Sequence, residues 1–249
     1  MNRIDQMQKV VRTSHPRSIE KEDRGGPMSL GFPHRLFTPE HYEPRYDYPL
    51  VIWLHSDQSS EFEIENVMPA LSVRNYVAVS IRGNHRCYGR RNLFTWNQTP
   101  SGQAVVEECI FEAIESASEN LSIHPDKVFL AGYGSGGSLA QLIALRYPER
   151  FAGVVSCNGL FPDLPRSLVR WKAAKSMPIL WMHGVNSLEC GIDSMCDMLR
   201  SAYLSALQVY PVQFPCGDEL DAGMLAKANR FMMQIVTGES IVLHEKQQA

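Results

Sequence analysis

Residues 128–151 read VFLAGYGSGGSLAQLIALRYPERF, and a short glycine-rich turn joins the two halves of this stretch. The apolar run at 128–131 predicts a strand, and residues 136–147 predict a helix. A turn of the form G-x-S-x-G between a strand and a helix is the place where many enzymes expose a catalytic serine. Anchored on Gly132 and Gly136, this turn reads Gly-Tyr-Gly-Ser-Gly. The central position is Gly134, which has no side chain, and Ser135 comes one place too late.

Strand and helix patterns alternate on both sides of this turn. A first strand and turn are predicted within residues 34–44, and further strands at 48–55, 76–81, 127–132, 151–159, 178–184 and 209–214. Helices are predicted at 61–71, 102–121, 136–147, 194–207 and 218–236. Strands that alternate with helices of this length predict a mainly parallel sheet with helices on both faces.

Two of the predicted helices have apolar residues at helical spacing. In residues 102–121 we expect the buried face to hold Val105, Ile110, Ala113 and Ile114. In the last helix the apolar residues fall on one face, namely Leu220, Met224, Leu225, Ala228, Phe231, Met232 and Ile235. We therefore predict one domain at 31–240, a polar N-terminal arm at 1–30 that is flexible or partner-bound, and a C-terminal tail at 241–249.

Composition sets the limits of the functional prediction. The chain has 249 residues, 44% of them hydrophobic, and a net charge of −3, so it suits a globular domain and gives no sign of nucleic-acid binding. We find neither a secretory signal nor a run near the roughly 18 apolar residues of a membrane span. The six cysteines lack C-x-x-C spacing, so we expect unpaired thiols, no metal, no cofactor and a cytoplasmic location.

Several phrases, in order, carry a resemblance to a known family. They are PLVIWLHS, VMPALSVRNYVAVSIRG, VFLAGYGSGGSLAQLIALRYPERFAGVVSCNG and MPILWMHG. From about residue 34 to 237 the chain resembles the α/β-hydrolase fold, and within it the phospholipase/carboxylesterase branch of small, lid-poor esterases. The resemblance implies a serine hydrolase with the catalytic order nucleophile, acid, histidine.

The three catalytic positions that the resemblance implies are all substituted. The nucleophile position is Gly134. The family's acid comes three residues after the glycine of MPILWMHG, and Ser187 stands there. The family's histidine falls in the loop after the last strand, and Asp218 of CGDEL stands there. Acyl transfer requires all three groups together, so we predict that the usual triad is absent.

The loop that would bind the developing oxyanion is also altered. In active relatives this loop resembles His-Gly-Gly-Gly, because glycine lets backbone N–H groups approach the substrate. This chain has His55-Ser56-Asp57-Gln58, which adds bulk and a carboxylate where negative charge must be stabilised. We expect these residues, with Ser135, to line the former pocket.

Substitutes for the missing groups are few. Ser135 is the fallback nucleophile, although a hydroxyl at a helix N-terminus is more often a cap. Glu189 or Asp193 is a candidate acid. Of the eight histidines, only His244 follows the last strand, and we expect His183 to be a packed, hydrogen-bonded histidine. An Asp218 base accepts protons poorly at neutral pH unless burial raises its pKa.

A basic loop, RGNHRCYGRRN at residues 82–92, follows the strand at 76–81. It therefore lies at the carboxyl end of the sheet, where open α/β folds bind ligands. We predict a solvated loop or a candidate site for an anion or acidic partner, formed by Arg82, His85, Arg86, Arg90 and Arg91. The aromatic residues Tyr88, Phe94 and Trp96 belong to a contact surface or to the core.

Together these patterns predict a catalytically degenerate α/β-hydrolase-fold protein with a binding or scaffold role. The ligand or protein partner is unknown, and the protein is a candidate homo-oligomer. The alternative is an ester or thioester hydrolase that uses Ser135 with an unrecognised base. A third hypothesis is a metal-assisted enzyme, but the sequence lacks the clustered histidine and cysteine ligands that such a site needs.

Overall fold

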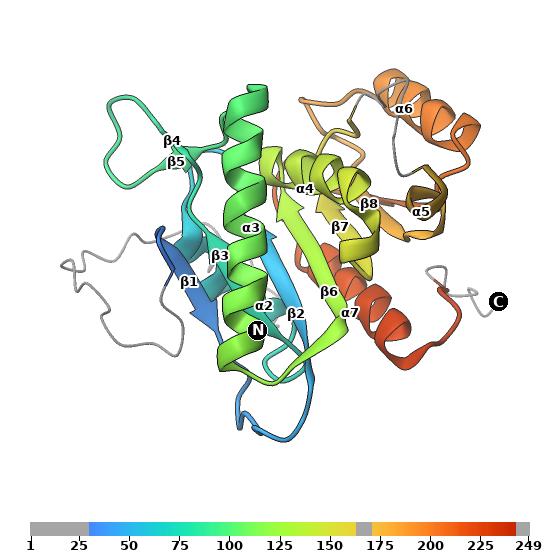
Figure 1. Cartoon of the computed structure of the whole chain (residues 1–249). Coiled ribbons are helices and arrows are strands. Elements are labelled where there is room, and N and C mark those ends of the chain that lie inside the picture. The colour runs from blue at the N-terminus through green and yellow to red at the C-terminus, as the bar shows by residue number, and fades with distance from the viewer. Residues whose placement is uncertain (1–29, 163–170, 243–249) are drawn as a thin grey trace, which may run out of the picture.

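The computed structural model describes residues 30–162 and 171–242. The predicted N-terminal arm, most of the predicted C-terminal tail, and His244 lie outside these residues. The described residues form a central sheet with helices packed on both sides (Figure 1).

The central sheet has seven strands in the order β1-β3-β2-β6-β7-β8-β9. They are β1 (His34–Phe37), β2 (Tyr48–Leu54), β3 (Val77–Ile81), β6 (Ile123–Tyr133), β7 (Gly153–Cys157), β8 (Ile179–Gly184) and β9 (Val209–Phe214). Strand β1 pairs antiparallel with β3, and every other pairing is parallel. The predicted mainly parallel sheet is therefore confirmed.

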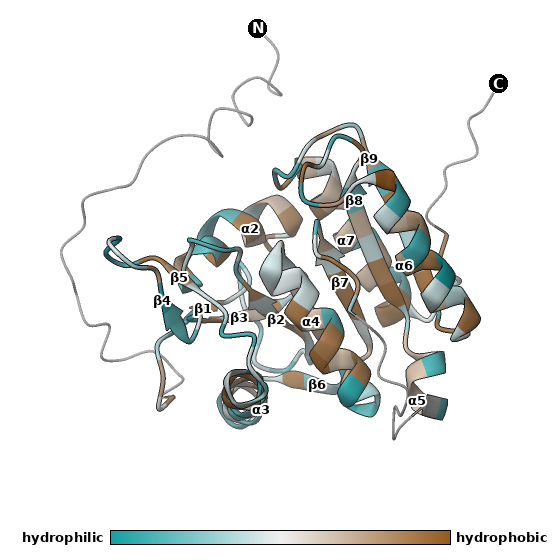
Figure 2. Cartoon of the chain, turned by 90° about the horizontal axis from the view of Figure 1, so that it is seen from above, coloured by the Kyte–Doolittle hydropathy of each residue, from teal (hydrophilic) through white to brown (hydrophobic). Residues whose placement is uncertain are grey.

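Helices cover both faces of the sheet (Figure 2). One core packs the sheet against α3, α4 and α6, and the other packs it against α2 and α7. The helices are α2 (Ile64–Leu71), α3 (Pro100–Asn120), α4 (Ser135–Arg146), α5 (Trp171–Ser176), α6 (Ile192–Leu204) and α7 (Ala222–Thr237). Short 3-10 turns lie at Glu61–Glu63 and Pro148–Arg150.

Strand β2 shows why a continuous apolar run becomes a central strand. All seven of its residues are buried. Leu50 and Leu54 point into the core of α3 and α4, whereas Val51 and Trp53 point into the core of α2 and α7. Because side chains alternate along a strand, a strand covered on both faces needs apolar residues at every position.

Both long helices predicted from the sequence are present, with two corrections. Leu220 lies before α7, which begins at Ala222, so it is not on the helical face predicted for it. In α7 the predicted apolar face is buried at Met224, Phe231 and Met232, among others. In α3 the prediction for Val105 was wrong, because this side chain is 47% exposed and the neighbouring Val106 is buried instead. Val106 lies four residues before Ile110, at helical spacing, whereas Val105 lies five residues before it, so the period itself favours Val106.

The segment predicted as a basic loop contains a small hairpin. Strands β4 (His85–Arg86) and β5 (Phe94–Thr95) pair antiparallel and form a separate two-stranded sheet. Cys87 N–H donates to the carbonyl of Leu93 at 2.9 Å, which extends the pairing toward the tip. The hairpin projects from the side of the molecule (Figures 1 and 2).

Candidate functional site

The turn between β6 and α4 has a left-handed backbone at its centre. Gly134 has φ 56° and ψ −125°, and its N–H donates to the carbonyl of Cys157 at 2.9 Å. A residue with a Cβ is strained at these angles, whereas glycine adopts them readily. A Cβ built on Gly134 meets only Ser56 Cβ, at 3.8 Å. The turn therefore has room for a side chain at residue 134.

The neighbouring glycines allow α4 to pack closely against the sheet. A Cβ on Gly136 would lie 2.2 Å from the carbonyl oxygen of Leu54 and 2.4 Å from that of His55. A Cβ on Gly132 would lie 2.6 Å from the backbone of Gly136. Glycine is required at both positions because the chain passes backbone against backbone at the start of the helix.

The residues at the acid and histidine positions lie in contact. The hydroxyl of Ser187 donates to one carboxylate oxygen of Asp218, and the N–H of Leu188 donates to the other at 2.9 Å. The hydroxyl of Tyr133, one residue before Gly134, donates to the carbonyl of Asp218. The loops after β8 and β9 thus meet beside the turn, joined by a serine–aspartate hydrogen bond.

The pKa of Asp218 is lowered from its ordinary value. Partial burial acts to raise it, but hydrogen bonds from the Ser187 hydroxyl and the N–H groups of Leu188 and Glu189 outweigh burial. A carboxylate with a lowered pKa is an even poorer proton acceptor at neutral pH. Asp218 therefore does not have the proton affinity expected of a substitute base.

Asn158 holds this loop region in place, and the sequence reasoning missed it. Its side chain is buried, accepts from the N–H of Gly184 at 2.8 Å and donates to the carbonyl of Glu219 at 3.0 Å. Its φ is 50°, a left-handed value that asparagine tolerates better than most residues. The Asn-Gly pair at the end of β7 was the available signal, since that dipeptide marks such turns.

The loop at the oxyanion position is bound by a carboxylate that the sequence reasoning also missed. Glu63 accepts from the Ser56 hydroxyl at 2.7 Å, from the Ser56 N–H at 3.2 Å and from the indole N–H of Trp53 at 2.9 Å. The hydroxyl of Thr95 donates to Asp57. A carboxylate that already binds the Ser56 N–H opposes the accumulation of negative charge at this place.

His55 is locked into the structure as a neutral imidazole. Its Nδ1 lies 2.7 Å from the carbonyl of Ser56, and its Nε2 accepts from the N–H of Gly83 at 2.8 Å. These partners assign the proton to Nδ1. Burial lowers the pKa of His55, although the Ser56 carbonyl and nearby carboxylates act in the opposite direction. Both ring nitrogens are therefore engaged with the backbone.

Among the residues that the structure describes, the fallback groups are not joined into a second triad. The Ser135 hydroxyl is buried in the first turn of α4 and has no hydrogen-bond partner among the described residues. His183 is buried, as expected. The prediction that it is hydrogen-bonded was wrong, because neither ring nitrogen has a hydrogen-bond partner among the described residues. Glu189 and Asp193 are both exposed.

The five basic residues of the segment 82–92 do not act as one group. Arg82 forms an ion pair with the buried Glu61 and lies over the ring of Phe94 at 4.7 Å. The exposed residues are His85, Arg86, Arg90 and Arg91. The hairpin that carries them points to the side, away from α4 (Figures 1 and 2), so the structure does not bring these side chains to the turn.

Negative charge surrounds the turn. Burial raises the pKa of Tyr133, and the carboxylates of Glu63, Asp218 and Glu219 raise it further.

Within residues 30–162 and 171–242, no three histidine, cysteine or acidic side chains are grouped as a metal site requires. None of the helices described is long and apolar enough to cross a membrane.

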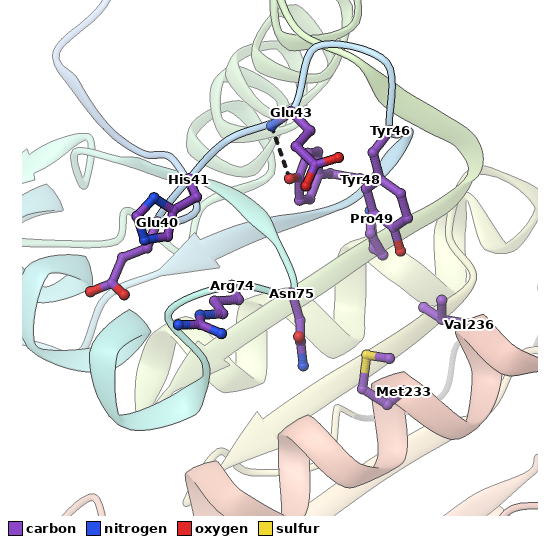
Figure 3. A pocket seen from close by; sticks show the side chains of 10 residues that line it. All are labelled: Glu40, His41, Glu43, Tyr46, Tyr48, Pro49, Arg74, Asn75, Met233 and Val236. Carbon is purple, nitrogen blue, oxygen red and sulfur yellow. Dashed lines mark hydrogen bonds between the residues drawn. The ribbon is translucent and has the colours of Figure 1, made fainter.

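A separate cavity of about 320 Å³ lies at the amino ends of β2 and β3 (Figure 3). Met233 and Val236 of α7 line one side. The other side is lined by Glu40, His41, Glu43, Tyr46, Tyr48, Pro49, Arg74 and Asn75. The turn at Gly134 lies at the carboxyl end of the sheet, so this cavity is not the pocket of that turn.

Comparison with known proteins agrees with this geometry. The profile of the family described as Phospholipase/Carboxylesterase matches residues 97–236, more than half of the chain. An Arabidopsis thaliana protein described as "Probable carboxylesterase SOBER1-like" is 27% identical over 94 residues, which cover 36% of this chain and 36% of that protein. The chain thus matches little more than a third of that relative's length.

Solved structures show the same fold at low identity. The carboxylesterase of Bacillus cereus superposes with a TM-score of 0.64 and 15% identity, covering 81% of this chain and 93% of that one. Arabidopsis thaliana SOBER1 superposes with a TM-score of 0.60 and 17% identity, covering 76% of this chain and 99% of that one. The chain therefore belongs to the phospholipase/carboxylesterase family of the α/β-hydrolase fold.

Proposed function

We propose that this protein is a catalytically degenerate member of its family, with a binding or assembly role in place of ester hydrolysis. The observation that carries the proposal is the pairing of Ser187 with Asp218 beside a turn centred on Gly134. A triad needs an acid that orients a histidine and a histidine that deprotonates a nucleophile. At these positions the chain offers a hydroxyl, a carboxylate and a hydrogen atom.

The surroundings of the turn support the same proposal. Glu63 accepts both the N–H and the hydroxyl of Ser56, so a carboxylate lies where an enzyme would stabilise an oxyanion. His55 is the histidine of this loop, and both of its ring nitrogens are hydrogen-bonded to backbone groups. In this part of the described structure, the Ser56 N–H is not free to stabilise an oxyanion and the His55 ring is not free to transfer a proton.

The second candidate is a hydrolase that uses Ser135, and family membership favours it. Turnover of a short activated ester by the purified protein distinguishes the two. We expect turnover at the level of an unrelated protein, unchanged in Ser135→Ala. Turnover above that level that disappears in Ser135→Ala would overturn the proposal and establish the second candidate.

The chain also provides its own positive control. The triple variant Gly134→Ser, Ser187→Asp, Asp218→His places a serine, an aspartate and a histidine at the three catalytic positions. The residues now at the last two positions, Ser187 and Asp218, are hydrogen-bonded to each other. We expect measurable but weak turnover, because Glu63 still occupies the Ser56 N–H. Gly134→Ser alone should give none, because triad members act as a unit.

A further inference from the structure

The hairpin of residues 85–95 carries positive charge that no other described residue neutralises. Arg86, Arg90 and Arg91 are exposed, and none forms an ion pair within the described chain. Tyr88 at the tip is fully exposed, unlike the nearby Trp96, which is buried. Tyrosine and arginine are the residue types that contribute most to protein–protein contacts.

Helix α3 presents the complementary surface. Glu108, Glu112, Glu115 and Glu119 are all exposed, and their spacing of three or four residues places them in one stripe about 16 Å long. The helix contains no lysine or arginine. Like charges at this spacing destabilise a helix, so a bound cation would stabilise it.

The stripe also has an apolar end that suits the hairpin. Val105 lies three residues before Glu108 and is 47% exposed, although its neighbour Val106 is buried. Positions three residues apart share a helix face, so Val105 continues the acidic stripe. A surface with one apolar residue followed by four carboxylates is opposite in charge to a hairpin with one tyrosine and three guanidinium groups.

We propose that two copies of this chain form a dimer in which the basic hairpin of each, Arg86, Tyr88, Arg90 and Arg91, docks on the acidic stripe of α3 in the other. The hairpin and stripe form no ion pair with each other inside one chain. A two-fold axis makes both contacts at once, so each complementary pair is used twice. The dimer goes beyond the loss of catalysis and does not depend on it.

Salt is the first test, using sedimentation velocity of the full-length protein over a range of concentrations. Exposed ion pairs are weak singly and are screened by salt, since the Debye length falls from about 30 Å at 0.01 M to about 3 Å at 1 M ionic strength. We expect dimers at low ionic strength that dissociate as salt is added. A chain that stays monomeric at low ionic strength, or dimers that salt does not weaken, would overturn the proposal.

Charge reversal is the decisive test. Arg86→Glu/Arg90→Glu/Arg91→Glu makes the hairpin acidic, and Glu108→Lys/Glu115→Lys/Glu119→Lys makes the stripe basic. Each variant alone opposes like charges, so we expect its association constant to fall at least about tenfold. An equal mixture of the two restores opposite charges at both contacts and should form heterodimers. Circular dichroism checks that both variants are folded.

A matched control separates these contacts from net charge. Arg45→Glu/Arg74→Glu/Lys172→Glu changes the net charge as much as the hairpin reversal does, at exposed residues outside both surfaces. We expect it to dimerise like wild type. Folded single-surface variants that still dimerise, a mixture that stays monomeric, or a control that dissociates as fully as the hairpin variant would each reject the docking. Ester turnover measured on the same samples keeps this result separate from the proposed loss of catalysis.

Discussion

The turn at residues 132–137 and the two loops beside it depart from the expected catalytic pattern of the family in different ways. In the turn the backbone has the left-handed centre and close glycine packing of an exposed nucleophile site, but the side chain at its centre is missing. In the loops after β8 and β9, Ser187 and Asp218 stand at the expected acid and histidine positions and are hydrogen-bonded to each other. The turn thus keeps the close backbone packing and the loops keep a side-chain contact, although the expected triad residues stand at none of the three positions.

The contrast has a physical cause. Backbone groups at the turn pack against β2 and β7 at distances that tolerate no Cβ, so a change there affects the whole fold. A side chain at residue 134 would lie in open space, since a Cβ there meets only Ser56 Cβ at 3.8 Å. A substitution there leaves the close packing of α4 intact, whereas a Cβ at Gly132 or Gly136 would collide with backbone atoms.

The largest expected effect is for Gly136→Ala. The new Cβ would lie 2.2 Å and 2.4 Å from two backbone oxygens at the end of β2, which cannot move without separating α4 from the sheet. We expect a loss of about 3 kcal/mol or more in the free energy of unfolding, measured with denaturant. Gly191→Ala is the matched control, because a Cβ there meets nothing within 4 Å. If the two variants were equally stable, the explanation that close backbone packing requires glycine at residue 136 would be wrong.

The next effect is for Gly134→Ser. Here the space is open, so the cost comes from the backbone alone, and φ 56° with ψ −125° should cost about 1–3 kcal/mol for a residue with a Cβ. Gly134→Ala should cost the same, since both variants add the same Cβ. Denaturant unfolding of the two variants measures this. A serine variant as stable as wild type would show that residue 134 is not strained.

A smaller effect is expected for Ser187→Ala. Losing the hydroxyl removes a hydrogen bond to Asp218, so the pKa of Asp218 should rise and stability at neutral pH should fall by about 1 kcal/mol. A lowered folded pKa adds stability above the unfolded value of about 3.9, and this contribution disappears as pH falls through the folded pKa. The difference between variant and wild type should therefore vanish in acid.

The carboxyl titration of Asp218, followed by NMR, checks this prediction directly, with Ser194→Ala on the exposed face of α6 as control. An unchanged Asp218 titration in Ser187→Ala would mean that the serine–aspartate contact is not made in solution.

The smallest effect concerns pH and His55. Burial lowers its folded pKa, so below about pH 6.5 the unfolded chain binds a proton that the folded protein does not. Stability should therefore fall as pH drops from about 6.5 toward the folded pKa of His55. The NMR titration of its ring measures this. A ring that titrates at or above about pH 6.5 would contradict its locked, neutral state.

Much of the fold could be predicted from the sequence, because the central strands β2, β3, β6, β7 and β8 contain apolar runs and the helical segments alternate with them. Strand β9 begins and ends at the predicted residues, and the parallel sheet follows from the alternation of elements. The prediction for Val105 failed because Val105 lies five residues before Ile110, whereas Val106 lies at the helical spacing of four. The β4–β5 pairing was missed because two strands of two residues leave no periodicity to detect.

The site could be predicted only in part. Motif spacing located Gly134, Ser187 and Asp218, and the last two are in contact in the structure. Glu63 was missed because nothing in a helical stretch indicates that one carboxylate turns back to Ser56. The absence of a hydrogen-bond partner for His183 among the described residues was also missed, since hydrogen bonding depends on neighbours from other elements. Contacts between distant segments are the part that local patterns do not contain.

The central claim is that the fold has kept the shape of an esterase site without its nucleophile. Labelling with an activated phosphonate that reacts with catalytic serines, followed by mass spectrometry of the peptide around residues 128–146, tests it most directly. We expect no labelled serine in the wild type and labelling at residue 134 in Gly134→Ser, Ser187→Asp, Asp218→His. Labelling of wild-type Ser135, abolished by Ser135→Ala, would contradict the claim.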